Sequence, residues 1–138
     1  MNTLYLAGPM TGVELANFPA FDEAATRLRK MGWHVISPAD LNRINGFHEY
    51  RQAIDDKQDR ADMLGTDISH LDGADAIALL PGWQHSDGVF AELAFARLKS
   101  MPVFDSRNGR QLDWRVVWKL ALNTQSTKLF AQGAEHFV

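Results

Sequence analysis

Short apolar runs alternate with longer segments of helical periodicity along most of this chain. The run at residues 76–80 contains no polar residue, which is typical of a strand buried on both faces of a sheet. Residues 3–7 and 33–37 are two further strand-like runs, and residues 102–104 form a shorter fourth one. Strands that alternate with helices of about ten or more residues predict a parallel sheet with helices on both faces. We therefore expect an α/β fold, a three-layer α/β/α sandwich with a mainly parallel sheet, Rossmann- or flavodoxin-like.

The helices are predicted from apolar residues that recur three and four positions apart. The first follows Asn17, a candidate N-cap, and is stopped by Gly32. The next two cover about 60–73 and 87–99, and a last helix begins near Trp114. The residues expected to face the core are Phe21, Ala24, Ala25, Leu28, Met31, Ala61, Leu64, Ile68, Leu71, Val89, Phe90, Leu93 and Ala94.

Two stretches lack this regularity. Residues 40–51 are polar and show no clear period, so we interpret the stretch from residue 40 to about residue 60 as an irregular insertion or a lid. Residues 123–138 form a polar tail that the pattern leaves unassigned. The length of 138 residues is that of a single domain, 1–138, with a C-terminal helix and tail at 106–138.

Trp114 and Trp118 fall on one face of the last predicted helix. Two tryptophans are more than a terminal helix needs for its own packing, and large exposed aromatic surface is typical of protein interfaces. We therefore expect a homodimer formed through this helix.

Composition narrows the class of protein. The net charge of -3 gives no basic surface for a nucleic acid polymer. The chain has no cysteine, which excludes disulfides, thiolate zinc sites and cysteine nucleophiles and is consistent with a cytoplasmic protein. We find neither a signal peptide nor an apolar run approaching the ~20 residues of a membrane helix, so no membrane partner is expected.

No cofactor is predicted. The five histidines have no metal-ligand spacing, so we expect no catalytic metal. The glycines at positions 8 and 12 match neither the dinucleotide fingerprint nor the phosphate-binding loop of nucleotide hydrolases.

Glu92 is the strongest candidate for a catalytic residue. It lies in the second turn of the helix that follows the buried strand at 76–80, and its neighbours are apolar. Open α/β sheets bind their ligands at the carboxyl ends of their strands. Near a helix N-terminus the carboxylate would be stabilised as the anion, which suits nucleophilic attack on a sugar anomeric carbon. The alternative is a glutamate that faces solvent.

Asp67 lies on or beside the apolar face formed by Leu64, Ile68 and Leu71. A carboxyl group there needs a partner or a chemical role. With a raised pKa it could donate a proton to a leaving group, as the second member of a two-carboxylate pair. Pairing with Arg60 or capping of a backbone amide is an equally good interpretation.

Four further residues are weaker candidates. Ser86 and Gly88, at a strand-to-helix junction, could bind a phosphate with the hydroxyl and free helix N–H groups, or could form an ordinary helix cap. Tyr5, in the first strand, could orient Glu92 or simply pack in the core. Trp83 could stack on a nucleobase or cover the edge of the core.

With these residues in view, the chain resembles the nucleoside 2-deoxyribosyltransferase-like family, and most of all its small, often phage-encoded members. The family also contains 2′-deoxynucleoside 5′-monophosphate N-hydrolases. The resemblance covers residues 3 to about 105. It rests on the segments YLAGPMTG at 5–12, NFPAF at 17–21, LPGW at 80–83, and S-x-G-x-x-x-E at 86–92.

The resemblance implies a role for each matching position. Glu92 matches the nucleophile that attacks C1′, Asp67 the aspartate that helps protonate the leaving base, and Tyr5 the tyrosine that holds the nucleophile. Ser86 and Gly88 match positions that contact the 5′-phosphate. Gly8 matches the glycine of the loop after the first strand.

The expected activity is cleavage of the N-glycosidic bond of a deoxynucleoside or its 5′-monophosphate through a covalent ester at Glu92, by hydrolysis or base exchange. A small-molecule nucleoside or nucleotide is thus the expected partner. Two alternatives remain open at this stage. The chain could be a non-catalytic nucleotide-binding or sensing module, or a phage-associated structural protein, because a fold does not determine a function.

Overall fold

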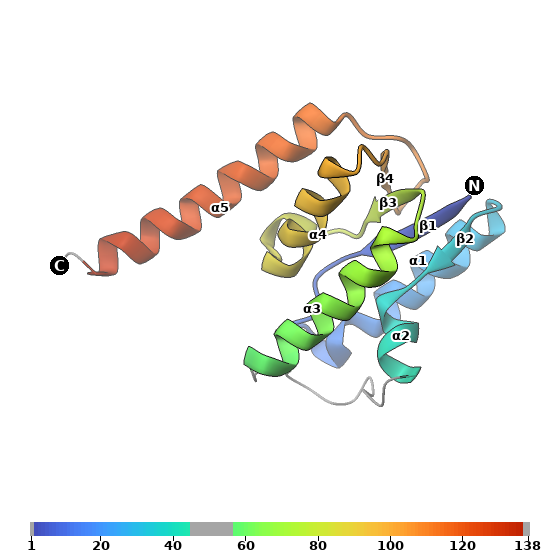
Figure 1. The fold of residues 1–138 in the computed structure, drawn as a ribbon, viewed down its shortest axis with the longest axis horizontal. Helices are drawn as coiled ribbons and strands as arrows, with labels where there is room; N and C mark the ends of the chain where they lie inside the picture. Colours follow the sequence, from blue (N-terminus) through green and yellow to red (C-terminus); the bar gives the residue numbers. More distant parts are fainter. Residues whose placement is uncertain (1, 45–56, 137–138) are drawn as a thin grey trace.

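A computed structural model describes residues 2–44 and 57–136. Four parallel strands form one sheet in the order β2-β1-β3-β4, as the alternating pattern predicted (Figure 1). Helices cover both faces, so the chain is a three-layer α/β/α sandwich. The elements are β1 (Thr3–Ala7), η1 (Glu14–Asn17), α1 (Phe18–Lys30), β2 (His34–Ile36), α2 (Pro38–Ile44), α3 (Lys57–Asp72), β3 (Ala76–Leu79), η2 (Trp83–His85), α4 (Asp87–Leu98), β4 (Val103–Asp105) and α5 (Trp114–His136).

The central strands β1 and β3 separate two cores. Successive side chains of a strand point to opposite faces, so Leu4 and Leu6 face one layer while Tyr5 and Ala7 face the other. Helices α1 and α2 pack on the first face, and α3, α4 and α5 pack on the second. The functional candidates lie on the second face, at the carboxyl ends of the strands.

The start of α1 differs from the prediction. Asn17 does precede the helix, but its side chain makes no capping hydrogen bond, and its Nδ2 instead donates to the carbonyl oxygen of Pro9 at 2.9 Å. Leu15, Ala16 and Asn17 all have positive φ angles of 53° to 62°, in the left-handed region that residues other than glycine seldom adopt. This left-handed turn leads from the loop after β1 into α1.

Three other expectations are wrong. Residues 40–44 are not irregular but belong to α2, which begins with Pro38, a residue that suits a first helical turn. Residues 45–56 lie outside the described part. Residues 123–136 are not a separate tail, because α5 continues to His136 and projects beyond the body of the domain (Figure 1). Met31, expected in the core, is 50% exposed because α1 ends one residue earlier.

The two tryptophans of α5 pack within the chain. The Trp118 ring stacks on Phe90 with centroids 5.5 Å apart, and the Arg97 guanidinium lies 5.0 Å from the Trp118 centroid. Trp114 Nε1 donates a 2.6 Å hydrogen bond to the carbonyl oxygen of Met101. The sequence predicted an interface on the argument that two tryptophans exceed what the helix needs for its own packing. Both are used for packing within the chain, so they no longer give a reason to expect an interface there.

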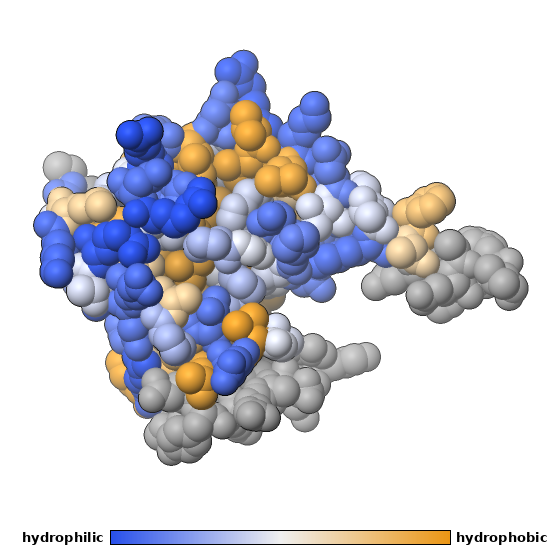
Figure 2. Space-filling view, turned by 180° about the vertical axis from the view of Figure 1, so that it is seen from behind, coloured by the Kyte–Doolittle hydropathy of each residue, from blue (hydrophilic) through white to orange (hydrophobic). Residues whose placement is uncertain are grey.

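Apolar side chains are instead exposed farther along α5, where Leu129 is 66% and Phe130 80% exposed. Figure 2 shows hydrophobic atoms on this projecting end of the helix. Within residues 2–44 and 57–136, no helix combines the length and the apolar composition needed to cross a membrane.

Candidate active site

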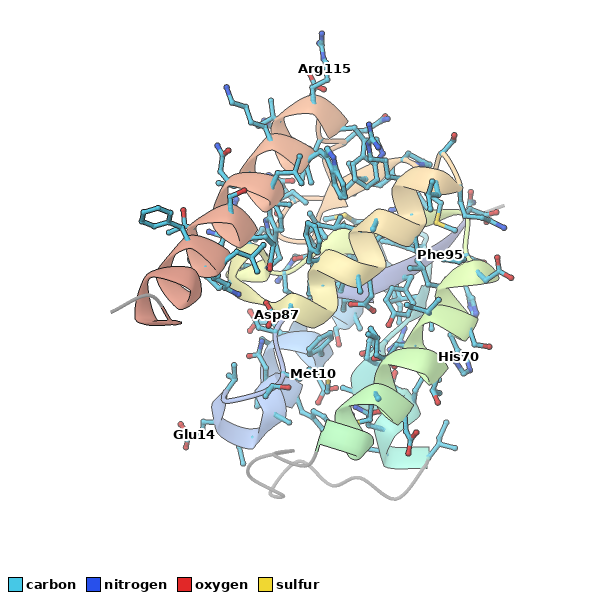
Figure 3. All side chains as sticks on the ribbon, turned by 60° about the vertical axis from the view of Figure 1, so that its left-hand side comes forward. Met10, Glu14, His70, Asp87, Phe95 and Arg115 are labelled. Atoms are coloured by element: carbon cyan, nitrogen blue, oxygen red, sulfur yellow. The ribbon has the colours of Figure 1, made fainter. Side chains whose placement is uncertain are left out.

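A cavity of about 770 Å³ lies at the carboxyl ends of β1 and β3. Its walls come from the loop after β1, from α3, and from the segment that joins β3 to α4. In Figure 3 the labelled Met10 and Asp87 lie near each other at this end of the sheet, and both line the cavity. The lining residues are Gly8, Pro9, Met10, Thr11, Val13, Ala61, Met63, Leu64, Asp67, Gly82, His85, Ser86, Asp87, Gly88, Val89 and Glu92.

The cavity brings together the two carboxyl groups that the sequence singled out. Glu92 is 5% exposed and Asp67 is 8% exposed, so the solvent-facing alternative for Glu92 is wrong. Neither Glu92 Oε2 nor Asp67 Oδ1 has a hydrogen-bond partner among the described residues. Buried polar atoms are normally paired, so two unpartnered carboxyl oxygens on residues that line one cavity make it a candidate site for a polar ligand.

Burial controls the protonation of this pair. Burial and the charge of Asp67 raise the pKa of Glu92 from 4.5 to about 8, although the Tyr5 hydroxyl acts in the opposite direction. Burial also raises the pKa of Asp67 from 3.8 to about 7, with His70 opposing the shift. The raised pKa predicted for Asp67 is thus supported, but Glu92 is not held ionised by the helix dipole, because loss of hydration outweighs that effect.

Between pH 7 and 8 the carboxyl pair therefore carries about one proton. Protons leave two interacting groups in successive steps, and the intermediate state has one carboxylate and one carboxylic acid. Since the pKa of Glu92 is the higher of the two, this proton lies mainly on Glu92, and the form with an ionised Glu92 and a protonated Asp67 is the less populated one. A nucleophile at Glu92 and a proton donor at Asp67 require that form.

Tyr5 lies beneath the pair and does not line the cavity. It is completely buried in β1, where Leu79 and Val89 belong to the same hydrophobic core. Burial is the main cause that raises the pKa of its hydroxyl, followed by the charges of Glu92 and Asp67. The hydroxyl is near enough to Glu92 for each to affect the pKa of the other, yet no hydrogen bond with good geometry is formed. Tyr5 is therefore a core residue whose hydroxyl lies close to Glu92 without a hydrogen bond to it.

Ser86 and Gly88 form one wall of the cavity, at the start of α4. The Ser86 hydroxyl accepts a 3.2 Å hydrogen bond from the backbone N–H of Val89, so it does cap the helix. The hydroxyl hydrogen remains available for another acceptor, because this bond uses only an oxygen lone pair. The cap and a ligand contact are therefore compatible.

Trp83 does not line the cavity. It is half-buried in η2 and packs against the second core, which favours the alternative that it covers the core edge. Sequence reasoning missed His85, Met10 and Met63, which do line the cavity. The signal in the sequence that identifies His85 is its position between Trp83 and Ser86.

Gly8 lines the cavity, and its close packing against Leu80 explains why this position needs a glycine. A Cβ atom at this position would lie 2.5 Å from Leu80 Cδ1 and 2.7 Å from Leu80 Cβ. Leu80 is fixed from both sides, because it is 2% exposed and its N–H donates to the carbonyl oxygen of Ala7 at 2.8 Å. Only glycine lets the ends of β1 and β3 approach so closely.

Gly8→Ala is expected to destabilise the protein by about 1–3 kcal/mol, because the added methyl group overpacks a fixed contact. The matched control is Gly65→Ala on α3, where no atom lies within 4 Å of the added Cβ. That change should stabilise the helix by about 0.5–1 kcal/mol. Chemical denaturation measures both, and a Gly8→Ala protein as stable as the wild type would contradict the packing argument.

The fold and cavity define an α/β domain with a buried carboxyl pair at the carboxyl edge of its sheet. Among the described residues, no cluster of three or more histidine, aspartate or glutamate side chains could hold a metal ion.

Residues 2–105 match the model of the family DUF4406, which is described as a domain of unknown function, and the chain belongs to this family. Neither the curated proteins nor the solved structures include a match. The family match ends with β4, so α5 lies outside it.

Proposed function

We propose that this protein cleaves the N-glycosidic bond of a deoxynucleoside or its 5′-monophosphate, as the resemblance to the nucleoside 2-deoxyribosyltransferase-like family implies. The observation that carries the proposal is the pair formed by Glu92 and Asp67, two buried carboxyl groups with unpartnered oxygens in one cavity. Retaining cleavage of a glycosidic bond needs one carboxylate as nucleophile and one carboxylic acid as proton donor.

In the first step the carboxylate of Glu92 attacks C1′ of the sugar. The C1′–N bond breaks as the Glu92 O–C1′ bond forms, and the departing base takes the proton of Asp67. In the second step a water molecule attacks C1′, Asp67 accepts a proton from that water, and the ester bond to Glu92 breaks. If a second base replaces water, the same intermediate leads to base exchange.

The size and lining of the cavity support a nucleotide-sized substrate. A volume of about 770 Å³ is within the range of pockets that enclose small organic ligands. Met10, Met63 and Leu64 supply apolar contact area for a base, while Ser86 and Gly88 offer a hydroxyl and a helix N-terminus for a 5′-phosphate. The absence of cysteine is consistent with the cytoplasm as the place of the reaction.

The experiment is free-base release from a panel of ribo- and deoxyribonucleosides and their 5′-monophosphates, followed by chromatography with and without an added acceptor base. We expect release from at least one deoxy substrate. If no base is released but a nucleotide raises the melting temperature, the protein is a nucleotide-binding module. If neither occurs, the proposal fails and a structural role is favoured.

We also propose that the protein is a homodimer, now through the projecting half of α5 rather than through Trp114 and Trp118. The reason is the exposure of Leu129 and Phe130 on a helix end that projects from the domain (Figure 2). Light scattering coupled to gel filtration is expected to give twice the 15.5 kDa chain mass for the wild type. The Phe130→Asp variant should give the mass of a single chain. A wild-type monomer at all concentrations would contradict the proposal.

A further inference from the structure

The loop that follows β1 has its two ends joined by a side-chain hydrogen bond. Asn17 Nδ2, at the far end, donates to the carbonyl oxygen of Pro9 at 2.9 Å. Within the loop, the backbone N–H of Val13 donates to the carbonyl oxygen of Met10 at 3.2 Å, and that of Ala16 donates to Val13 at 3.0 Å. Pro9, Met10 and Val13 line the cavity. Asn17 does not line the cavity itself, so it can affect a ligand only through this wall.

The end of the loop that carries Asn17 is anchored in the first core. Ala16 is 5% and Phe18 1% exposed, and both belong to the same buried cluster. Asn17 lies between these two residues, and its side chain makes no cap for α1. Its hydrogen bond to Pro9 therefore ties the cavity wall to a fixed part of the core.

The turn that places Asn17 has an unfavourable backbone conformation. Leu15 and Ala16 are left-handed, a conformation in which the Cβ atom lies too close to the following carbonyl oxygen. Asn17 is left-handed too, and asparagine tolerates this conformation better than most residues. Such conformations persist only where the surrounding structure determines them, and they are frequent at ligand-binding sites. The place of this turn, next to a cavity wall, indicates that it serves the site.

We propose that Asn17 is a positioning residue, which holds the Pro9–Met10 wall of the cavity in the place where it receives the base of the substrate. The inference rests on the proposed function, in which Met10, labelled in Figure 3, offers apolar contact area to the base. Met10 is also held by α2, because the buried Asn42 donates a 3.7 Å hydrogen bond from Nδ2 to the Met10 sulfur. Two asparagine side chains thus fix neighbouring residues of one wall.

A purely structural Asn17 would behave differently from a positioning residue. Lower stability alone would change the binding of all ligands to a similar degree, or of none. A displaced Pro9–Met10 wall would weaken a ligand that carries a base. It would leave a sugar phosphate nearly unaffected, because the proposed phosphate contacts, Ser86 and Gly88, belong to another wall.

The test is calorimetric titration of Glu92→Gln protein, in which turnover is blocked, with each common deoxynucleoside 5′-monophosphate and with 2-deoxyribose 5-phosphate. Adding Asn17→Gly is expected to weaken the nucleotide about tenfold, the effect of one lost hydrogen bond, and the sugar phosphate much less. Glycine adopts the left-handed conformation freely, so the backbone of the turn is preserved. Equal losses for both ligands, or unchanged affinities, would overturn the proposal.

A second variant removes the hydrogen bond without removing the side chain. Asn17→Asp keeps the size of the residue, but an ionised carboxylate only accepts hydrogen bonds and cannot donate to the Pro9 carbonyl. It should show the same selective loss, and an Asn17→Asp protein with the parent's selectivity would overturn the proposal. The matched control is Ala16→Gly, which changes the same turn by one methyl group and keeps the Asn17 side chain.

Hydrogen exchange tests the wall without any ligand. The amides of Val13 and Ala16 are bonded within the loop, so Asn17→Gly should make them exchange about tenfold faster, while the amides of α4 keep their rates. Unchanged exchange in the loop would overturn this inference alone, even where the wild type releases a base. If the Glu92→Gln protein binds neither probe and the wild type releases no base, the role in base recognition is overturned together with the proposed function.

Discussion

Glu92→Gln is expected to reduce base release by about a thousandfold or more, because an amide cannot form the glycosyl ester. The substitution keeps the shape of a side chain that is 5% exposed, so binding of substrate should persist. Chromatographic base release and calorimetric binding measure the two properties separately. The matched control is Glu23→Gln, at a glutamate of α1 whose side chain is 80% exposed, and it should leave the rate as it is.

The same variant should be more stable than the wild type at high pH. The folded protein holds the Glu92 proton up to a pKa of about 8, whereas the unfolded chain loses it near 4.5. The stability that Glu92 contributes is therefore complete below about pH 4.5 and is lost as the pH rises toward 8, by about 1.4 kcal/mol for each pH unit. Glutamine does not titrate, so the melting-temperature advantage of Glu92→Gln should grow between pH 5 and 8.

Together these measurements distinguish a functional glutamate from a structural one. A structural Glu92 would lose stability on substitution, because replacing a needed charge leaves its partners unsatisfied. A Glu92→Gln protein with nearly full activity would contradict the nucleophile, whatever its stability. A melting-temperature difference independent of pH would contradict the raised pKa.

The presence of Asp67 and Glu92 in one cavity could be predicted, because the position of each residue follows from a local pattern in the sequence. The apolar run before Pro81 identified β3, and the ends of parallel strands share one edge of the sheet. The helical period placed Asp67 beside an inward face of α3. Both arguments need only the order of strands and helices, which the alternation along the chain provides.

The protonation of Glu92 could not be predicted in the same way. The position of Glu92 in α4 indicates a helix dipole, but the loss of hydration depends on how deeply α3, α4 and β1 enclose the carboxyl group. That enclosure is a property of tertiary packing, and no local pattern encodes it.

The continuation of α5 was missed for a related reason. The large apolar residues of 123–136, Leu129 and Phe130, are adjacent and do not recur at helical spacing, so hydrophobic periodicity gives no signal for a helix. Contacts distant in sequence fix part of this segment, since Lys128 and Gln125 bond to Asp87 some forty positions earlier. Periodicity identifies helices that bury an apolar stripe, whereas this half of α5 is joined to the domain through polar contacts.

Asp67→Asn is expected to lower base release by about 10²- to 10⁴-fold, because the departing base loses its proton donor. In the wild type the rate should be greatest near pH 7–8, where the pair holds about one proton. Below that range the second proton removes the nucleophile, and above it the donor is lost. The bell-shaped profile is measured as kcat/KM against pH.

The variant should change the shape of this profile as well as its height. Asparagine cannot lose a proton, so the fall at high pH should disappear. Asp67 also raises the pKa of Glu92 through its charge, so the rise at low pH should move to a lower pH when that charge is absent. Asp72→Asn, at an exposed aspartate of the same helix that pairs with Lys99, is the matched control and should keep the wild-type profile.

A substrate with an activated leaving group separates proton donation from substrate positioning. A nucleotide whose base is already cationic, such as a 7-methylpurine, departs without needing a proton. Asp67→Asn should therefore cost this substrate much less activity than the unmodified nucleotide if Asp67 is the donor. An equal loss for both substrates would mean that Asp67 only positions the base, and a fall at high pH that survives in the variant would assign the donor to another group.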